Sequence, residues 1–279
     1  MKVFILGSTG MIGHKIFYHL SRNNKYEIFN ISKSRLNGST LITDLRDTTD
    51  ITRLIKKYKP DFIINSSGLL IEDCENDHLS AIKINSLLPC YLDSISKKYK
   101  FKLIQISTDC VFSGRNGPYL DNNKPDATSY YGKTKALGEV NDNLTIRTSV
   151  IGPDLSSDGS ELFNWFMKQK SSINGYTKSL WSGITTLELS KAVEALLYTD
   201  DSGIKNISSN VNISKFDLLR MINDLSNKNI TINPVEGPIH NKCLIRTDNF
   251  IHQSDLSYEI LLTEMFKDIS STDLYTHYQ

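Results

Sequence analysis

The sequence has almost no net charge, no long apolar run and no leader-like start. Lysine and arginine number 32 against 31 aspartates and glutamates in 279 residues, so no overall field favours nucleic acid or an anionic membrane. The apolar runs fall far short of the ~20 residues that a membrane-spanning helix needs. The chain starts directly with an apolar segment, so we expect no signal or transit peptide. These absences predict a cytoplasmic protein that binds neither nucleic acid nor membranes.

Cysteine and histidine are few, and their spacing excludes the common disulfide and metal patterns. The four cysteines form no C-x-x-C pair, which is typical of reduced thiols in the cytoplasm. The six histidines show neither H-x-x-x-H nor H-x-x-E-H spacing. We therefore predict no metal site.

The N-terminal segment has the pattern of a phosphate-binding turn. Residues 3–6 are an apolar run of the kind that a strand buried on both faces shows. Glycines at positions 7, 10 and 13 follow, with helical spacing over residues 11–23. Such glycines let the backbone approach a pyrophosphate, and the helix N-terminus supplies free N–H groups; the alternative is a tight turn without a ligand. The predicted contacts are Gly7, Thr9, Gly10, Met11, Ile12 and Gly13.

The second predicted strand, residues 27–31, ends in the basic sequence Ser32-Lys33-Ser34-Arg35. An NAD-selective site usually has Asp or Glu here, which accepts hydrogen bonds from the ribose hydroxyls. A hydroxyl and two cations suit a 2′-phosphate instead, although solvated basic loops are also common. Lys33 and Arg35 therefore favour NADPH over NADH as the cofactor.

Two further strand ends complete the predicted cofactor site. The strand at residues 40–42 precedes an acidic turn that we place at the adenine ring. The strand at residues 61–64 precedes small residues, which allow ribose and phosphates to lie close to the backbone. A helical stretch over residues 78–99 follows, with Pro89 inside it. The expected contacts at the two strand ends are Asp44, Leu45, Ser66, Ser67 and Gly68.

Strands alternate with helices through the first half of the chain, and strands at residues 103–106 and 144–147 continue the pattern. This alternation predicts an α/β fold with a Rossmann-type doubly wound parallel sheet. We assign residues 1–150 to an NAD(P)-binding Rossmann domain. Residues 151–279 form a smaller substrate-binding lobe that partly returns to that domain. Helices are expected in this lobe at 162–170, 186–198, 214–226 and 258–270.

The candidate catalytic groups lie between residues 107 and 135. One predicted strand ends at Ser107-Thr108-Asp109, and Tyr131 and Lys135 stand four residues apart on a predicted helix, so both side chains project from one face. A free phenol titrates near pH ~10. A nearby ammonium lowers that pKa and suits the phenol for general acid–base catalysis. The pair alone is a common pattern, and its alternative is an exposed Tyr and Lys on a surface helix.

These motifs, in this order, resemble an extended short-chain dehydrogenase/reductase. Ile106-Ser-Thr-Asp-Cys-Val-Phe-Ser-Gly114, Pro118-Tyr119 and Tyr131-Gly-Lys-Thr-Lys-Ala-Leu-Gly-Glu139 are similar to the dTDP-4-dehydrorhamnose reductase family. The resemblance is close over residues 1–150 and weak beyond them. It implies reduction, by NADPH or NADH, of the C4 ketone of a nucleotide-diphosphate-linked 4-keto-6-deoxy sugar for cell-surface polysaccharide biosynthesis.

The same resemblance implies a role for each candidate catalytic residue. Tyr131 would donate a proton to the C4 oxygen. Lys135 would bind the nicotinamide ribose and lower the pKa of Tyr131. Thr108, together with Asp109, would position the sugar.

Related proteins with other functions differ from this chain at single positions. Sugar-nucleotide 4,6-dehydratases have a Glu where this chain has Cys110, so a dehydratase is not expected. Asp109 argues against a 4-epimerase, which usually has a small residue there, and this alternative stays open. A second alternative is a non-catalytic, NADP-binding regulatory subunit of the methionine adenosyltransferase type. The complete set of Thr108, Tyr131 and Lys135 favours an enzyme over that alternative.

The C-terminal half departs from the family pattern. Val150 stands where the family usually has Trp, and Tyr176-Thr-Lys178 and Gly183-Ile-Thr185 replace its Asp-Gln and Pro-Thr pairs. Two substrates therefore stay open, namely dTDP-4-dehydrorhamnose and a UDP-linked 2-acetamido-2,6-dideoxy-4-ketohexose. The sequence does not decide the oligomeric state, and a homodimer is compatible with it.

Overall fold

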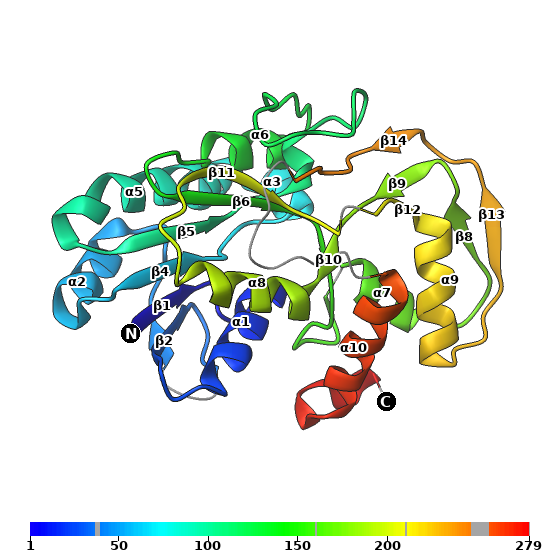
Figure 1. Cartoon of the computed structure of the whole chain (residues 1–279), viewed down its shortest axis with the longest axis horizontal. Coiled ribbons are helices and arrows are strands. Elements are labelled where there is room, and N and C mark those ends of the chain that lie inside the picture. The colour runs from blue at the N-terminus through cyan, green and yellow to red at the C-terminus, as the bar shows by residue number, and fades with distance from the viewer. Residues whose placement is uncertain (37–39, 160, 210, 247–256, 279) are drawn as a thin grey trace.

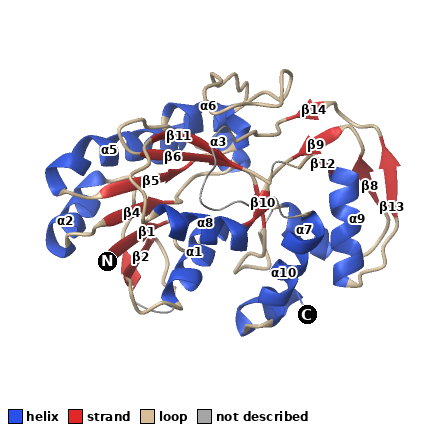
Figure 2. Ribbon diagram, in the orientation of Figure 1, coloured by secondary structure: helices blue, strands red, loops and turns tan. Residues whose placement is uncertain are grey.

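The computed structural model describes residues 1–36, 40–159, 161–209, 211–246 and 257–278. Its centre is a seven-stranded parallel sheet with the strand order β11-β6-β5-β4-β1-β2-β3 (Figures 1 and 2). The predicted doubly wound α/β fold is thereby confirmed. The strands are β1 (Lys2–Leu6), β2 (Glu27–Ser32), β3 (Thr40–Ile42), β4 (Phe62–Asn65), β5 (Lys102–Ile106), β6 (Leu144–Thr148) and β11 (Gly203–Ile207).

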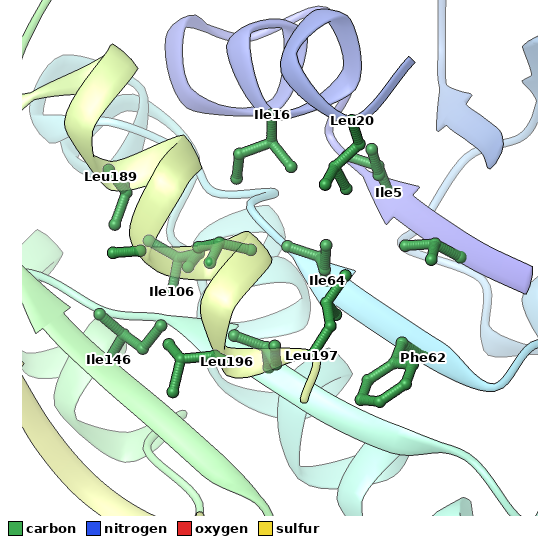
Figure 3. Packing of buried hydrophobic residues seen from close by; sticks show 14 of the residues in the cluster. Ile5, Ile16, Leu20, Phe62, Ile64, Ile106, Ile146, Leu189, Leu196 and Leu197 are labelled. Atoms are coloured by element: carbon green, nitrogen blue, oxygen red, sulfur yellow. The ribbon is translucent and has the colours of Figure 1, made fainter. Parts of the chain in front are cut away.

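The sheet is buried on both faces, which explains the apolar strands of the sequence. Within β1 the side chains of residues 3–6 are all inaccessible to solvent and alternate between two core clusters. One cluster lies beneath α1 (Met11–Ser21) and α8 (Thr186–Leu196), as Figure 3 shows. The other lies beneath α2 (Thr48–Tyr58) and α5 (Leu88–Tyr99).

The helical stretch predicted over residues 78–99 is divided into three parts. It consists of α4 (His78–Ala81), the π-helix η1 (Ile82–Leu87) and α5. Pro89 lies in the first turn of α5, where a missing N–H disrupts few helical hydrogen bonds. The π-helix is a feature that often marks functional sites, and it holds Asn85 buried against the loop after β4.

The later part of the chain contributes both to the central sheet and to a second core. The strand β11 pairs with β6, and α8 packs against α1. The second core lies among α7 (Leu162–Lys168), α9 (Lys215–Ser226) and α10 (Tyr258–Ser270). The division of the chain at residue 150 stays a prediction. The short strands here are β7 (Val150–Ile151), β8 (Ile173–Tyr176), β9 (Ser179–Trp181), β10 (Ile184–Thr185), β12 (Ile213–Ser214), β13 (Ile232–Val235) and β14 (His240–Asn241).

The C-terminal end of the described chain is fastened to α1, the helix that follows the glycine-rich turn. Lys15 forms a buried ion pair with Asp268, and His14 hydrogen-bonds to the Tyr275 hydroxyl at 2.9 Å. Burial lowers the pKa of His14 to about 4, so its ring is neutral near pH 7. Among the described residues, no helix combines the length and apolar character that a bilayer crossing would require.

Candidate active site

Two neighbouring cavities open where the strands of the central sheet end. The first, which we call the glycine-loop cavity, has a volume of about 480 Å³ and is lined by residues that follow β1, β2, β3 and β4. The second, the tyrosine cavity, has about 490 Å³ and is lined by Thr108, Asp109 and Tyr131 together with the start of α1. Asp73 lines both cavities. A separate hollow of about 620 Å³ beside α2 contains none of the predicted site residues.

Two of the three glycines in the first turn are required by the packing of the chain itself. Gly7 has φ +75°, and a Cβ there would lie 2.7 Å from the Cα of Ser67. A Cβ on Gly13 would lie 2.3 Å from the carbonyl oxygen of Gly7. At Gly10 the nearest atom would be 3.5 Å away, an ordinary contact distance. The protein itself therefore does not require glycine at position 10, and the space beside Gly10 is open to a ligand.

The N-terminus of α1 is suited to an anionic group. Gly10 provides no side-chain cap, whereas α2, α9 and α10 are each capped by a side-chain oxygen. The amides of an uncapped first turn and the positive end of the helix dipole favour a phosphate. Of the predicted cofactor contacts, those that line the glycine-loop cavity are Gly7, Thr9, Gly10, Lys33, Leu45, Ser66, Ser67 and Gly68.

The other predicted cofactor residues lie elsewhere. Met11 and Ile12 line the tyrosine cavity, and Gly13 packs beneath the turn. Arg35 is exposed and is absent from the described lining of both cavities. Asp44 accepts hydrogen bonds from the guanidinium of Arg46, with 2.9 Å between Nε and Oδ2, which lowers the pKa of Asp44 to about 2.

Arg46 is a cation that the sequence analysis missed. It lines the glycine-loop cavity, and its Nη1 donates to the Ser80 hydroxyl at 3.3 Å. The guanidinium therefore joins the loop after β3 to α4 across one side of the cavity. Its position two residues after Asp44 was the available signal, since an acid and a base at that spacing in a turn can pair.

The candidate catalytic residues meet because α6 (Tyr130–Leu137) packs tightly on the turn after β5. The hydroxyl of Ser129 caps this helix by accepting from the amide of Gly132 at 3.2 Å. A Cβ on Gly132 would lie 2.2 Å from the carbonyl oxygen of Cys110. This close approach places Tyr131 and Thr108 in the wall of the same cavity. The Thr108 hydroxyl also donates to Asp109 at 3.1 Å.

Lys135 lies one helical turn beyond Tyr131 and is buried. Its Nζ donates to the carbonyl oxygen of Ile106 at 2.7 Å and faces Gly68, which lines the glycine-loop cavity. Burial lowers the pKa of Lys135 to about 8, while Glu139 and Cys74 raise it. The ammonium therefore connects the end of β5 with the cofactor side of the site.

The expected lowering of the Tyr131 pKa by Lys135 is wrong in this structure. Burial raises the pKa of Tyr131 well above that of a free phenol, and Cys110 and Asp109 raise it further. The side chain of Thr108 lowers this pKa only in part. Lys135 is not among the main influences on this pKa, and its ammonium is directed at the carbonyl oxygen of Ile106. Tyr131 consequently keeps its proton at neutral pH.

Asn85 holds the two sides of the site together. Its Oδ1 accepts from the Leu69 amide at 2.9 Å, and its Nδ2 donates to the Leu69 carbonyl at 3.1 Å and to the Thr134 hydroxyl at 3.2 Å. These bonds fix the loop after β4 against α6. Asn85 is therefore a positioning residue, which the sequence analysis placed on a helix without a role.

Glu161 and Lys215 are charged residues close to Asp109 or Tyr131 that the sequence analysis did not single out. Glu161 lines the tyrosine cavity, and burial raises its pKa while Lys215 lowers it. Burial lowers the pKa of Lys215, and Asp109 is the largest electrostatic influence in the opposite direction. Both residues come from the part of the chain after residue 150, where no local motif marked them.

Comparison with known proteins identifies the family to which this chain is similar. A family model described as "RmlD substrate binding domain" matches residues 1–170. The spore coat polysaccharide biosynthesis protein SpsK of Bacillus subtilis is 26% identical over 216 residues, which cover 75% of this chain and 73% of SpsK. The dTDP-4-dehydrorhamnose reductase of Aggregatibacter actinomycetemcomitans is 27% identical over 140 residues, 50% of this chain and 45% of that protein.

A relative with a different name is similar over a comparable length of the chain. The methionine adenosyltransferase 2 subunit beta of Danio rerio is 29% identical over 138 residues, which cover 50% of this chain and 42% of that protein.

Among solved structures, the likeness extends along the whole fold in the crystal structure of a dTDP-4-dehydrorhamnose reductase from Bacillus anthracis in complex with NADP. The superposition of the two structures has a TM-score of 0.82 at 21% sequence identity. It covers 96% of this chain and 99% of the Bacillus anthracis chain.

Proposed function

Because the chain belongs to the RmlD substrate binding domain family, we propose that it is an NADPH-dependent sugar-nucleotide 4-ketoreductase. Its substrate would be a nucleotide-diphosphate-linked 4-keto-6-deoxy sugar, and its product would serve cell-surface polysaccharide biosynthesis. One observation carries this proposal, namely that Tyr131 and Thr108 line one cavity directly beside the glycine-loop cavity.

The glycine-loop cavity is the proposed cofactor site. The open face of Gly10 and the uncapped start of α1 suit a pyrophosphate, and Lys33 and Arg46 suit a 2′-phosphate. These cations favour NADPH, with NADH as a weaker alternative. Bound there, the nicotinamide supplies the hydride for reduction of a carbonyl.

The tyrosine cavity is the proposed site of the sugar. Reduction of a ketone places negative charge on its oxygen, and a phenol that keeps its proton can donate it there. The raised pKa of Tyr131 leaves the phenol protonated and available as that donor. Thr108 presents its hydroxyl in the same cavity, while the buried ammonium of Lys135 faces the cofactor side near Gly68.

The neighbouring residues disfavour elimination of water. Cys110 occupies the position where dehydratases use a carboxylate. Burial raises the pKa of its thiol to about 12, so it is a poor proton donor or acceptor at neutral pH. A reductase requires no acid–base group at that position.

An NADPH-oxidation assay tests the proposal. The purified chain is offered a panel of dTDP- and UDP-linked 4-keto-6-deoxy sugars, with and without a 2-acetamido group. We expect turnover of at least one of them and weak or no turnover of free keto sugars. Tight NADPH binding without turnover of any member of the panel would favour the regulatory-subunit alternative, for which the Danio rerio relative is the precedent.

A further inference from the structure

The tyrosine cavity has an uneven distribution of charge. Its described lining includes four carboxylates and neither lysine nor arginine. The substrate of the proposed function would bring a diphosphate, which carries about two negative charges near pH 7, to this region. Cations from outside the lining are needed to balance it. The four carboxylates are those of Glu72, Asp73, Asp109 and Glu161.

Two lysines on one small sheet provide such cations. The three-stranded sheet has the order β12-β9-β14. Lys215 directly follows β12 and begins α9, and Lys242 directly follows β14. The residues that precede them, Ser214 and Asn241, both pair with Leu180 of β9. The two lysines therefore leave the sheet from opposite sides of the same strand.

Both lysines are directed at the turn after β5. The Nζ of Lys242 lies 3.6 Å from the sulfur of Cys110. Lys215 lies over the ring of Trp181, with 4.9 Å between its Nζ and the ring centroid, and it interacts electrostatically with Asp109 and Cys110. The thiol of Cys110 is neutral at pH 7, so it does not neutralise either ammonium.

The two ammonium groups are available for a ligand. Within the described part of the chain, the Nζ of Lys215 makes no hydrogen bond, and no carboxylate lies within 4.0 Å of either lysine. Desolvation of an unpaired ammonium is costly, and a bound anion would offset that cost. The indole of Trp181 offsets part of it by a cation–π contact.

We propose that Lys215 and Lys242 form an anion subsite beside Cys110 that receives the diphosphate of a nucleotide-linked sugar. This subsite rests on the proposed function. In a hexose the C1 and C4 atoms lie on opposite sides of the ring. A sugar whose C4 oxygen faces Thr108 and Tyr131 therefore directs the phosphates on C1 away from those residues. The β12-β9-β14 sheet is where that path would meet two cations.

Isothermal titration calorimetry of nucleoside diphosphates tests this subsite. The protein is saturated with NADP⁺, so that the glycine-loop cavity does not compete, and is titrated with dTDP, UDP, thymidine and uridine. We expect Lys215→Met and Lys242→Met each to weaken the preferred diphosphate by about 10- to 100-fold, as for loss of one charge-assisted contact. The corresponding nucleoside should bind with unchanged affinity, and the Lys215→Arg variant should retain most of the diphosphate affinity.

The matched control is Lys170→Met, which removes the same charge from an exposed position in the same half of the chain. It should leave diphosphate affinity unchanged. The subsite is refuted if both lysine variants bind the diphosphate like the wild type, if the wild type binds it no better than the nucleoside, or if nucleoside affinity falls equally. Keto-sugar turnover with lysine-independent diphosphate binding would refute the subsite alone. Lysine-dependent binding without turnover would refute the reductase instead.

Discussion

Arg147 and Glu139 form an ion pair that is almost completely buried, with two parallel hydrogen bonds of 2.7 Å each. The pair joins β6 to the segment that follows α6. Glu139 also accepts from the Ser107 hydroxyl at 2.8 Å, and Arg147 donates to the carbonyl oxygen of Asp121 at 3.0 Å. The bidentate Arg147–Glu139 pair, through the Ser107 hydroxyl, therefore holds the turn that carries Thr108 in place.

This buried pair should be required for stability. The Arg147→Met variant leaves the Glu139 carboxylate buried and uncompensated, so we expect a loss of about 3–5 kcal/mol in the free energy of unfolding. Urea unfolding followed by circular dichroism measures it. The control is Lys97→Met at the exposed pair with Asp142, where we expect a loss of about 0–1 kcal/mol. Equal losses in the two variants would contradict the role of the buried pair.

Removal of the Tyr131 hydroxyl should stop the chemistry and spare the binding of the cofactor. We expect Tyr131→Phe to lower turnover of the keto-sugar substrate by about 10²- to 10⁴-fold, the usual contribution of one general acid. The affinity for NADPH should be unchanged, since the glycine-loop cavity is intact. Steady-state kinetics and fluorescence titration give the two quantities.

A neighbouring tyrosine provides the control for this variant. Tyr130 stacks on His78 at 4.0 Å between ring centroids and is half-buried. Its replacement by phenylalanine removes an identical atom one residue away, and turnover should stay near that of the wild type. Near-normal turnover by Tyr131→Phe would refute the assignment of the acid.

The pH dependence of cofactor binding should report Lys135. Its pKa is lowered to about 8 by burial, so the ammonium is present at pH 7 and is lost as the pH rises through about 8. The dissociation constant for NADPH should therefore rise above pH 8, and the Lys135→Met variant should bind weakly at every pH. Calorimetric titrations between pH 6 and 10 test this. A wild-type profile that stays flat to pH 10 would exclude Lys135 as the group.

The lowered pKa of Lys135 also affects stability, but here a rise in pH is favourable, whereas it weakens NADPH binding. The unfolded lysine titrates near 10.5, so between pH 8 and 10.5 the unfolded chain binds more protons than the folded one. The contribution of Lys135 to the free energy of unfolding therefore increases over this window. Because burial raises the pKa of Tyr131, its deprotonation should not change the turnover rate below pH 10.

The choice between NADPH and NADH should depend on Arg46 more than on Arg35. Arg46 lines the glycine-loop cavity, whereas Arg35 is exposed outside its described lining. We expect Arg46→Leu to weaken NADPH binding by about 10- to 100-fold, the scale of one charge-assisted contact, and to change NADH affinity far less. Arg35→Leu is the matched control. A larger loss in the Arg35 variant would restore the assignment made from the sequence.

Local patterns in the sequence determined most of the central sheet and the candidate catalytic pair, Tyr131 and Lys135. The apolar residues of β1 predicted a strand buried on both faces, because a parallel sheet covered by helices needs such strands. Glycines 7, 10 and 13 marked the turn, and the four-residue spacing of Tyr131 and Lys135 placed both on one face of α6. These features depend on neighbours within one turn or one strand, so sequence spacing alone reveals them.

The tertiary structure decided which charges meet and which protons are held. Arg46, Asn85 and Lys215 reach the site from segments far from Tyr131 in sequence, and their partners are set by packing that no local spacing encodes. The pKa of Tyr131 was predicted in the wrong direction for the same reason. The spacing to Lys135 was visible in the sequence, but the burial of the phenol and the direction of the ammonium arise only when β5, α6 and the later chain pack together.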